Sequence, residues 1–209
     1  METTSSSPAS PASPGKAPRT ARGEKTLAGI LDAARIEFGQ RGFAESSVVS
    51  ITGRAQVALG TFYTYFDSKE DLFSAIVRDM SNRVREAVAP ALEGATDALQ
   101  AEEHALAEYL RFVEHHREVY RIIDEAEFVD PRAFRAHYET TAARISSRLS
   151  SGVQRGEIKD NGALGQEVVA WAIMGMNVFL GLRFGVWGEE SSDKVAAEAN
   201  KLLSEGLRR

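Results

Sequence analysis

The chain of 209 residues is predicted to fold as an all-helical protein with two parts. After residue 18 only Pro90 and Pro131 remain, and no segment alternates apolar and polar residues between turn signals, as a strand would. Apolar residues instead recur every three or four positions. A short stretch rich in aromatic and hydroxyl residues, 47–69, follows a sparse basic arm. We therefore expect an N-terminal three-helix unit in residues 19–67 and a C-terminal multi-helix domain in residues 68–209.

Residues 1–18 hold four of the six prolines and five serines. Such a segment cannot bury enough apolar surface to offset the entropy lost on ordering, so we expect it to be a disordered tail. The basic arm overlaps its end and consists of Lys16, Arg19, Arg22 and Lys25.

Three short helices are expected next. The first is predicted from apolar residues at helical spacing and a stop at two glycines: Leu27, Ile30, Leu31, Ala34 and Phe38, then Gly39 and Gly42. The second begins at a cap on Ser46 or Ser47 and ends near Ala55. The third spans about Ala58 to Tyr65.

The larger domain begins with a long helix from a cap at Ser68, with acids in its first turn, to about Pro90. Asp130 followed by Pro131 is typical of a helix start. Periodicity and the intervening breaks predict the remaining helices at 97–115, 117–127, 131–155, 163–186 and 192–207.

Composition excludes some classes of protein. There is no cysteine, so disulfides and thiolate metal sites are excluded, which fits a cytoplasmic protein. The longest uncharged run, Val168–Leu182, is fifteen residues, short of the ~20 that a membrane helix needs. We therefore expect no membrane association, and a core helix there that is buried on nearly all sides. The N-terminus lacks the apolar segment of a signal peptide.

The net charge of −5 is unevenly distributed. Residues 1–66 carry seven Lys and Arg against five acids, so the excess of acids lies in the remainder. A local basic surface is sufficient for contact with phosphates, because screening confines the interaction to roughly 10 Å.

The stretch 47–69 predicts two crossed helices, of which the second can lie in a DNA groove. The residues expected to pack inside are Ile51, Ala55, Val57, Phe62 and Phe66, and those left to face outward are Gly60, Thr61, Tyr63, Thr64 and Tyr65. Tyrosine and threonine hydroxyls donate to phosphate oxygens, and Lys69 adds positive charge at the start of its helix. Tyr63 and Tyr65 cannot both point the same way. The alternative is an aromatic helical hairpin that only packs.

Residues Gly60–Leu72, GTFYTYFDSKEDL, closely resemble the G-T-F-Y-x-Y-F-x-S-K-E-x-L signature in the helix-turn-helix of the TetR family of transcriptional regulators. The preceding helix, with Phe38, Gly42 and Phe43, also fits. The resemblance is strong over residues 22–73, about a quarter of the chain, and architectural beyond them.

The resemblance implies a homodimer that binds a double-stranded DNA operator and a small-molecule effector. By matching position, the implied DNA-contacting residues are Ser47, Gly60, Thr61, Tyr63, Tyr65 and Lys69. Arg22 from the arm and Arg54 are weaker candidates. Three positions depart from the family pattern: Thr52, Gln56 and Ala58. If the usual turn is kept, Gln56 must adopt left-handed torsions at a cost of about 1 kcal/mol. Ala58 forgoes a helix cap worth ~1 kcal/mol.

Two helices, 163–186 and 192–207, are the predicted dimer interface, forming a four-helix bundle across a two-fold axis. The first places small residues among large ones, which allows close approach of helices: Trp171, Met174, Gly175, Val178 and Leu182. The alternative is that this helix is buried within one monomer.

A ligand pocket is expected between the helices at 97–127, 131–155 and 163–186. The residues that supply apolar faces with polar tips are Tyr109, Phe112, His116, Tyr120, Phe134, His137, Tyr138, Met176 and Phe179. Core packing would explain most of them equally well. An anionic ligand would need an arginine, and Arg144, Arg148 or Arg183 could serve. The four histidines lack metal-ligand spacing, so we expect no metal and no cofactor.

These observations together predict a ligand-responsive transcriptional regulator. We expect a repressor released from a pseudo-palindromic operator by a small hydrophobic or amphipathic ligand. An all-helical enzyme is the first alternative, and the chain shows no nucleophile motif, phosphate loop or metal set for it. A protein-interaction module that reuses the fold without DNA binding is the second.

Overall fold

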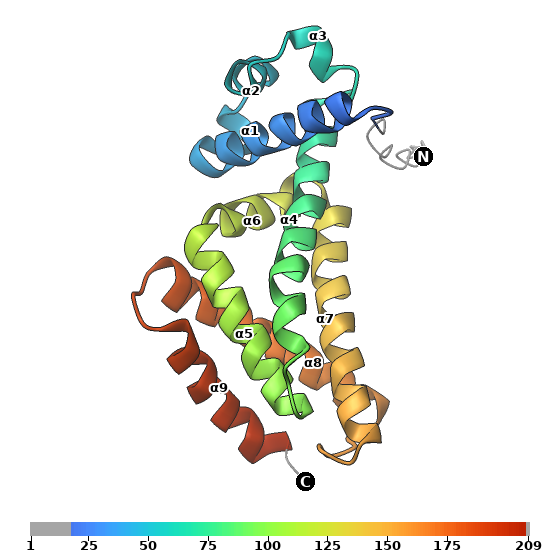
Figure 1. The fold of residues 1–209 in the computed structure, drawn as a ribbon, viewed down its shortest axis with the longest axis vertical. Coiled ribbons are helices and arrows are strands. Elements are labelled where there is room, and N and C mark those ends of the chain that lie inside the picture. The colour runs from blue at the N-terminus through green and yellow to red at the C-terminus, as the bar shows by residue number, and fades with distance from the viewer. Residues whose placement is uncertain (1–17, 208–209) are drawn as a thin grey trace, which may run out of the picture.

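The computed structural model describes residues 18–207 and is helical throughout, with no strand in that range. A small unit of three helices, α1 (Ala21–Glu45), α2 (Val48–Ala55) and α3 (Leu59–Phe62), lies at one end of an elongated molecule (Figure 1). The long helix α4 (Lys69–Leu92) runs from this unit into the larger domain. The predicted fold class is confirmed, and the predicted tail, residues 1–18, lies outside the described residues except for Pro18.

The larger domain contains five further helices. They are α5 (Ala98–His115), α6 (Glu118–Val129), α7 (Pro131–Gln154), α8 (Gly162–Leu180), which continues as the π-helical segment η1 (Gly181–Val186), and α9 (Ser192–Leu207). Of these, α5, α6 and α7 pack on α4, while α8 packs mainly on α7 and α9 on α5. The helix bounds lie close to the predicted ones. Pro90 lies within the last turn of α4 rather than ending it.

The small unit is held by an aromatic core that it shares with α4. Phe38, Phe62 and Phe73 are completely buried, and Phe66 is nearly so. Burying each such ring contributes about 1.5–3 kcal/mol relative to leaving it in water. Because Phe73 belongs to α4, the small unit and the long helix share one core.

Of the two glycines predicted to stop the first helix, Gly39 lies within α1 and Gly42 breaks it. Gly42 has φ 83° and ψ 171°, so the chain turns there before a last short segment of helix. A Cβ at this position would lie 2.4 Å from the Glu125 carboxylate and 2.9 Å from the Arg121 guanidinium. The positive φ favours glycine here, and a Cβ would also displace the ends of these two α6 side chains.

The turn between α2 and α3 follows the sequence-based expectations. Ser47 caps α2 and forms a reciprocal capping box with Ser50. Gln56 has φ 55° and ψ 41°, the predicted left-handed conformation, and the Ala58 side chain makes no cap. Helix α3 is shorter than predicted, and hydrogen-bonded turns continue it to Phe66.

The prediction that α8 is buried on nearly all sides is wrong. Leu164, Val168, Trp171 and Phe179 are 43–74% exposed and follow one face of the helix. Gly162–Val186 is also the one helix in residues 18–207 that is long and apolar enough, by length and composition alone, to cross a membrane. Its inner face packs on α5 and α7, however, so the exposed apolar surface is a stripe rather than the whole circumference.

Candidate nucleic-acid interface and ligand cavity

The outer surface of α2 and α3 presents several of the predicted DNA-contacting residues. Ser47 and Gly60 are exposed, Thr61 is half-buried, and Tyr63 is 50% exposed. A Cβ at Gly60 would meet nothing within 4 Å, so protein packing does not require glycine there. A bare backbone at this point would allow a close approach to a groove, as the sequence predicted.

The two tyrosines of the motif point in different directions, as expected. Tyr63 faces outward, whereas Tyr65 packs against the core and its hydroxyl donates to the carbonyl oxygen of Gly23 at 3.2 Å. Tyr65 thereby ties the turn after α3 to the first turn of α1, next to the exposed Arg22. Whether Tyr65 or Arg22 contacts DNA stays a prediction.

Lys69 has an internal role that the sequence did not reveal. Its Nζ donates to the carbonyl oxygens of Phe43, at 2.8 Å, and Ser46, at 2.9 Å, and lies 4.1 Å from the centre of the Phe43 ring. A cation at the end of α1 also suits the negative end of that helix dipole. The ammonium group is thus used to fix α4 against α1, and its predicted phosphate contact stays untested.

Arg54 is likewise directed into the unit. Its guanidinium donates to the Glu37 carboxylate at 3.0 and 3.1 Å, and Arg41 lies 3.4 Å from the same group. Burial would raise the pKa of Glu37, but hydrogen bonds from Ser50 and Arg54 and the charges of both arginines outweigh it and lower the pKa. This cluster orients α2 against α1.

The larger domain encloses a cavity of about 260 Å³ between α4, α5, α6, α7 and α8. Four of the nine predicted ligand residues line it: Tyr109, Tyr120, His137 and Tyr138. The other five do not line this cavity: Phe112, His116, Phe134, Met176 and Phe179. Phe112 is buried in the core, where it stacks on His116 with ring centres 4.5 Å apart.

Sequence reasoning missed the wall contributed by α4, whose lining residues are Val84, Arg85, Val88, Ala89 and Leu92. Their spacing is that of one helix face, and this signal was available. Met174 and Val178 were predicted at the dimer interface, but both line the cavity, and Met174 is only 5% exposed. Met174 and Val178 therefore lie on the flank of α8 that turns toward the cavity, and Val178, seven residues after Trp171, borders the exposed stripe.

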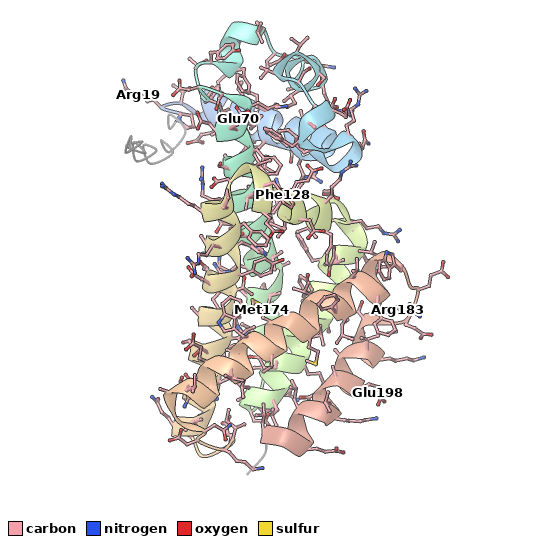
Figure 2. All side chains as sticks on the ribbon, turned by 180° about the vertical axis from the view of Figure 1, so that it is seen from behind. Arg19, Glu70, Phe128, Met174, Arg183 and Glu198 are labelled. Atoms are coloured by element: carbon pink, nitrogen blue, oxygen red, sulfur yellow. The ribbon has the colours of Figure 1, made fainter. Side chains whose placement is uncertain are left out.

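Figure 2, seen from behind relative to Figure 1, shows α8 crossing the side of the larger domain that faces the viewer, with Met174 near its middle and Arg183 beyond its end. Trp171 lies on the outward face, and a Cβ at Gly175 would meet nothing within 4 Å of this chain. Leu182 is partly buried. We name the exposed face of α8 the outer stripe, and define it by Leu164, Val168, Trp171, Gly175 and Phe179.

The polar groups inside the cavity are mostly neutral. The hydroxyl groups of Tyr109 and Tyr120 lie 3.2 Å apart, and Tyr120 donates to the carbonyl oxygen of Val178 at 2.5 Å. Burial raises the pKa of Tyr109 to about 12 and raises that of Tyr120 further. Burial, helped by the charge of Arg144, lowers the pKa of His137 to about 4, so this side chain is uncharged at neutral pH.

Helix α6 connects the cavity with the small unit. Its Tyr120 and Ile123 line the cavity, while Arg121 on another face donates to the carbonyl oxygens of Gln40, at 2.9 Å, and Arg41, at 3.2 Å. The carboxylate of Glu125 accepts a hydrogen bond from the backbone N–H of Phe43 at 2.6 Å. We call Arg121 and Glu125 the α6 clamp.

The family model described as bacterial regulatory proteins, tetR family, matches residues 30–76. The chain is 27% identical over 193 residues to the HTH-type transcriptional regulator YdgC of Bacillus subtilis (strain 168), covering 89% of this chain and 94% of YdgC.

Solved structures show the same fold. A TetR-like transcriptional regulator from Rhodococcus sp. RHA1 has a TM-score of 0.68 and 25% identity, covering 91% of this chain and 98% of its own. FadR from Bacillus subtilis, solved with stearoyl-CoA, has a TM-score of 0.72 and 17% identity, covering 86% of this chain and 98% of FadR, which shows the fold alone. Residues 30–76 thus form a DNA-binding segment of the tetR family, and the relatives that match most of the chain are transcriptional regulators.

Proposed function

We propose that this regulator is a cytoplasmic homodimeric repressor, released from a pseudo-palindromic operator by a small hydrophobic or amphipathic ligand. The observation that carries the proposal is that α4 and α6 each touch both the cavity and the small unit. A ligand that prefers one arrangement of these helices must therefore also bias the position of the DNA-binding surface.

For the DNA contact, we propose the exposed face of α2 and α3, centred on Tyr63 and Thr61, with Ser47 on a flanking phosphate and Gly60 close to the groove. Arg22 at the start of α1 would reach the adjacent backbone. Tyr65 and Lys69 are better assigned to positioning this surface, because their polar atoms are hydrogen-bonded within the protein. Domain bounds of 19–67 and 68–209 follow, although the aromatic core continues across residue 68 through Phe73.

For the dimer, we propose that the outer stripe of α8 packs against its symmetry mate, together with α9. Exposing large apolar residues to water in one continuous stripe is unfavourable in free energy, and such a stripe marks a protein–protein surface. Gly175 in the middle of the stripe would let two helices approach closely. The same pairing removes from solvent the face that makes α8 as apolar as a membrane helix.

For the ligand, the cavity offers an apolar wall with a few polar groups, as small-molecule sites do. FadR, which shares the fold, was solved with stearoyl-CoA, an amphipathic molecule. The α6 clamp gives ligand binding a direct route to α1, because movement of Tyr120 and Ile123 moves Arg121 and Glu125 on the same rigid helix.

Binding to the DNA upstream of the chain's own gene, measured across a salt series, tests the DNA-binding part. We expect log K to fall with log salt by about 0.9 per phosphate contact. Tyr63→Ala should weaken binding about tenfold or more, from the loss of a phosphate hydrogen bond, with dimerisation unchanged. Phe128→Ala, which removes an 82% exposed aromatic outside α2 and α3, is the matched control. Unchanged affinity of the Tyr63 variant at equal salt would contradict the assignment.

Sedimentation of a Trp171→Arg variant tests the dimer separately. Two guanidinium groups facing each other across the two-fold axis should give monomers at micromolar concentration and abolish operator binding, while the monomer fold is retained by circular dichroism. A variant that stays dimeric places the interface elsewhere.

A further inference from the structure

We infer that the cavity's ligand is a lipophilic anion, whose charged group binds at Arg144 between α4 and α7 while its apolar body fills the rest of the cavity. The inference rests on the proposed function, in that it assumes that the cavity binds the effector. It goes further by naming the chemical class of the effector and the residue that selects it.

Three arginines line one part of the cavity, and they are not equivalent. Arg148 is bound by both oxygens of the buried Glu102, at 2.6 and 3.0 Å. Arg85 lies 3.2 Å from the neighbouring Glu86 at the surface. Within residues 18–207, Arg144 faces only the like charges of Arg85 and Arg148 and makes no ion pair. A partly buried guanidinium without a counterion is unfavourable, so this position favours an incoming anion.

The packing of α4 on α7 shows why Arg144 has no partner. We call the line of contact between α4 and α7 the seam. Along it, Ser74 donates to Asp130 at 2.5 Å and Ser81 lies 2.6 Å from His137. In both polar contacts the two residues are 56 positions apart in the sequence. One further step of seven residues along both helices leads to Val88 and Arg144. Both of these line the cavity, and valine offers no polar atom. At this position the seam therefore offers no hydrogen-bond acceptor to Arg144, and a ligand atom can supply one.

The charge distribution gives the ligand a direction. Asp124 lines the cavity near Tyr138, and its negative charge helps to raise the pKa of that tyrosine. Arg144 lies six residues beyond Tyr138 on α7, about 9 Å along the helix axis. An anion is therefore repelled from the Asp124 end and attracted to the Arg144 end. Thr141, which lies between Tyr138 and Arg144 on α7, and Met174 on α8 carry no charge, and His137 before Tyr138 is uncharged as well.

A second polar feature fits a ligand with a further functional group. The Oδ1 atom of Asn177 is buried, lines the cavity wall and has no hydrogen-bond partner among residues 18–207. Buried polar atoms are usually satisfied, so the amide offers a contact to a hydroxyl, carbonyl or amide of the ligand.

The test compares probes that share an apolar chain and differ in charge. Octanoate and 1-octanol are titrated calorimetrically into the full-length dimer at pH 7.5. We expect octanoate to bind at least tenfold more tightly, since a charge-assisted hydrogen bond contributes that much. In Arg144→Gln the preference should fall to near unity, and in Arg144→Lys it should be partly retained. Arg183→Gln, which removes an exposed arginine outside the cavity, should keep the full preference.

Octanoyl-CoA is the third probe, because phosphates could supply the anion instead of a carboxylate. Binding of octanoyl-CoA that depends on Arg144, without binding of octanoate, supports the assignment of Arg144 and places the charge on the phosphates. Equal affinity for octanoate and octanol, a preference that survives in Arg144→Gln, or no binding of any probe overturns the inference.

The outcome separates this inference from the proposed function. If octanol and octanoate bind equally and both release the protein from its operator, the ligand-released regulator stands and only the anion site is lost. Thermal unfolding of each variant, followed by circular dichroism, excludes loss of fold as the reason for lost binding.

Discussion

The small unit and the cavity of the larger domain treat their charged groups in opposite ways. In the small unit, Lys69 donates to two backbone carbonyls, and the carboxylate of Glu37 faces two arginines. In the cavity, Arg144 has no counterion within the described residues. Buried polar atoms without a hydrogen-bond partner occur in both regions, Glu37 Oε1 in the small unit and Asn177 Oδ1 at the cavity, so the difference lies in the cations. The cations of the small unit are used to hold its helices together, whereas Arg144 is left open to a ligand.

The small unit also contains two adjacent aromatic residues with different roles. Phe62 is the last residue of α3 and Tyr63 follows it, yet Phe62 is completely buried and Tyr63 is 50% exposed. The DNA-binding surface thus depends on a rigid interior directly beneath it, as recognition elements do when their geometry must match a groove.

The largest expected effect comes from breaking that interior. Phe62→Ala should lower the free energy of unfolding by about 3–5 kcal/mol, through lost burial and the cavity that remains. Chemical denaturation measures this directly. Tyr63→Ala is the matched control, which should change stability by less than about 1 kcal/mol while impairing operator binding. A similar loss in both variants would mean that Tyr63 is part of the core.

A smaller loss of stability is expected at Lys69, whose charge is used inside the small unit. Lys69→Met should cost about 1–3 kcal/mol of stability, because two carbonyl oxygens lose a charged donor. The salt dependence of operator binding decides the role of Lys69. We expect an unchanged slope in the variant, whereas loss of a direct phosphate contact would reduce the slope by about 0.9. Lys25→Met, at an exposed position on α1, is the control for the loss of one charge.

The smallest effect concerns the neutral histidine of the cavity. Because the folded-state pKa of His137 is lowered to about 4, the unfolded chain binds a proton at this residue before the folded protein does. The stabilising contribution of neutral His137 is complete above about pH 6.5 and is lost as the pH falls toward 4. We expect a loss on the order of 1–2 kcal/mol over this window.

The measurement for His137 is the difference in unfolding free energy between the wild type and His137→Gln at pH 7 and pH 5. That difference should shrink as the pH falls. A constant difference would show that His137 is as accessible to protons in the folded protein as in the unfolded chain. Bound octanoate should not abolish the effect, since the neutral His137 lies in the apolar part of the cavity.

Much of the architecture could be predicted because its signals are local. A cap at Ser46 or Ser47 and a helix start at Pro131 were predicted from neighbouring residues, and the structure has the cap at Ser47 and the start at Pro131. The left-handed torsion at Gln56 was implied by the family resemblance, and the structure has it. The helix bounds in the larger domain follow from periodicity in the same way. Phe62 and Phe66 were correctly placed inside, because their spacing sets one face of a short helix.

The roles of individual side chains could not be predicted to the same degree. Met174 and Phe179 are both apolar residues of α8, yet one lines the cavity and the other is 72% exposed. Because they are five residues apart, they lie on different faces of the helix. Only the packing of α8 against α7 and α5 decides which face is inside. The π-helical segment after α8 shifts this phase further near Leu182.

The sequence by itself determined the helical class, the order of the helices and the family of the DNA-binding segment, because periodicity, caps and the Gly60–Leu72 motif are encoded in neighbouring residues. Only the tertiary structure decided which charges are used internally and which are left open. Lys69 is hydrogen-bonded to α1, whereas Arg144 lies across from Val88 and has no acceptor there. In both cases the deciding residues are tens of positions away in the sequence. Pairing between such distant groups depends on how the helices pack in space, and linear spacing does not specify that packing.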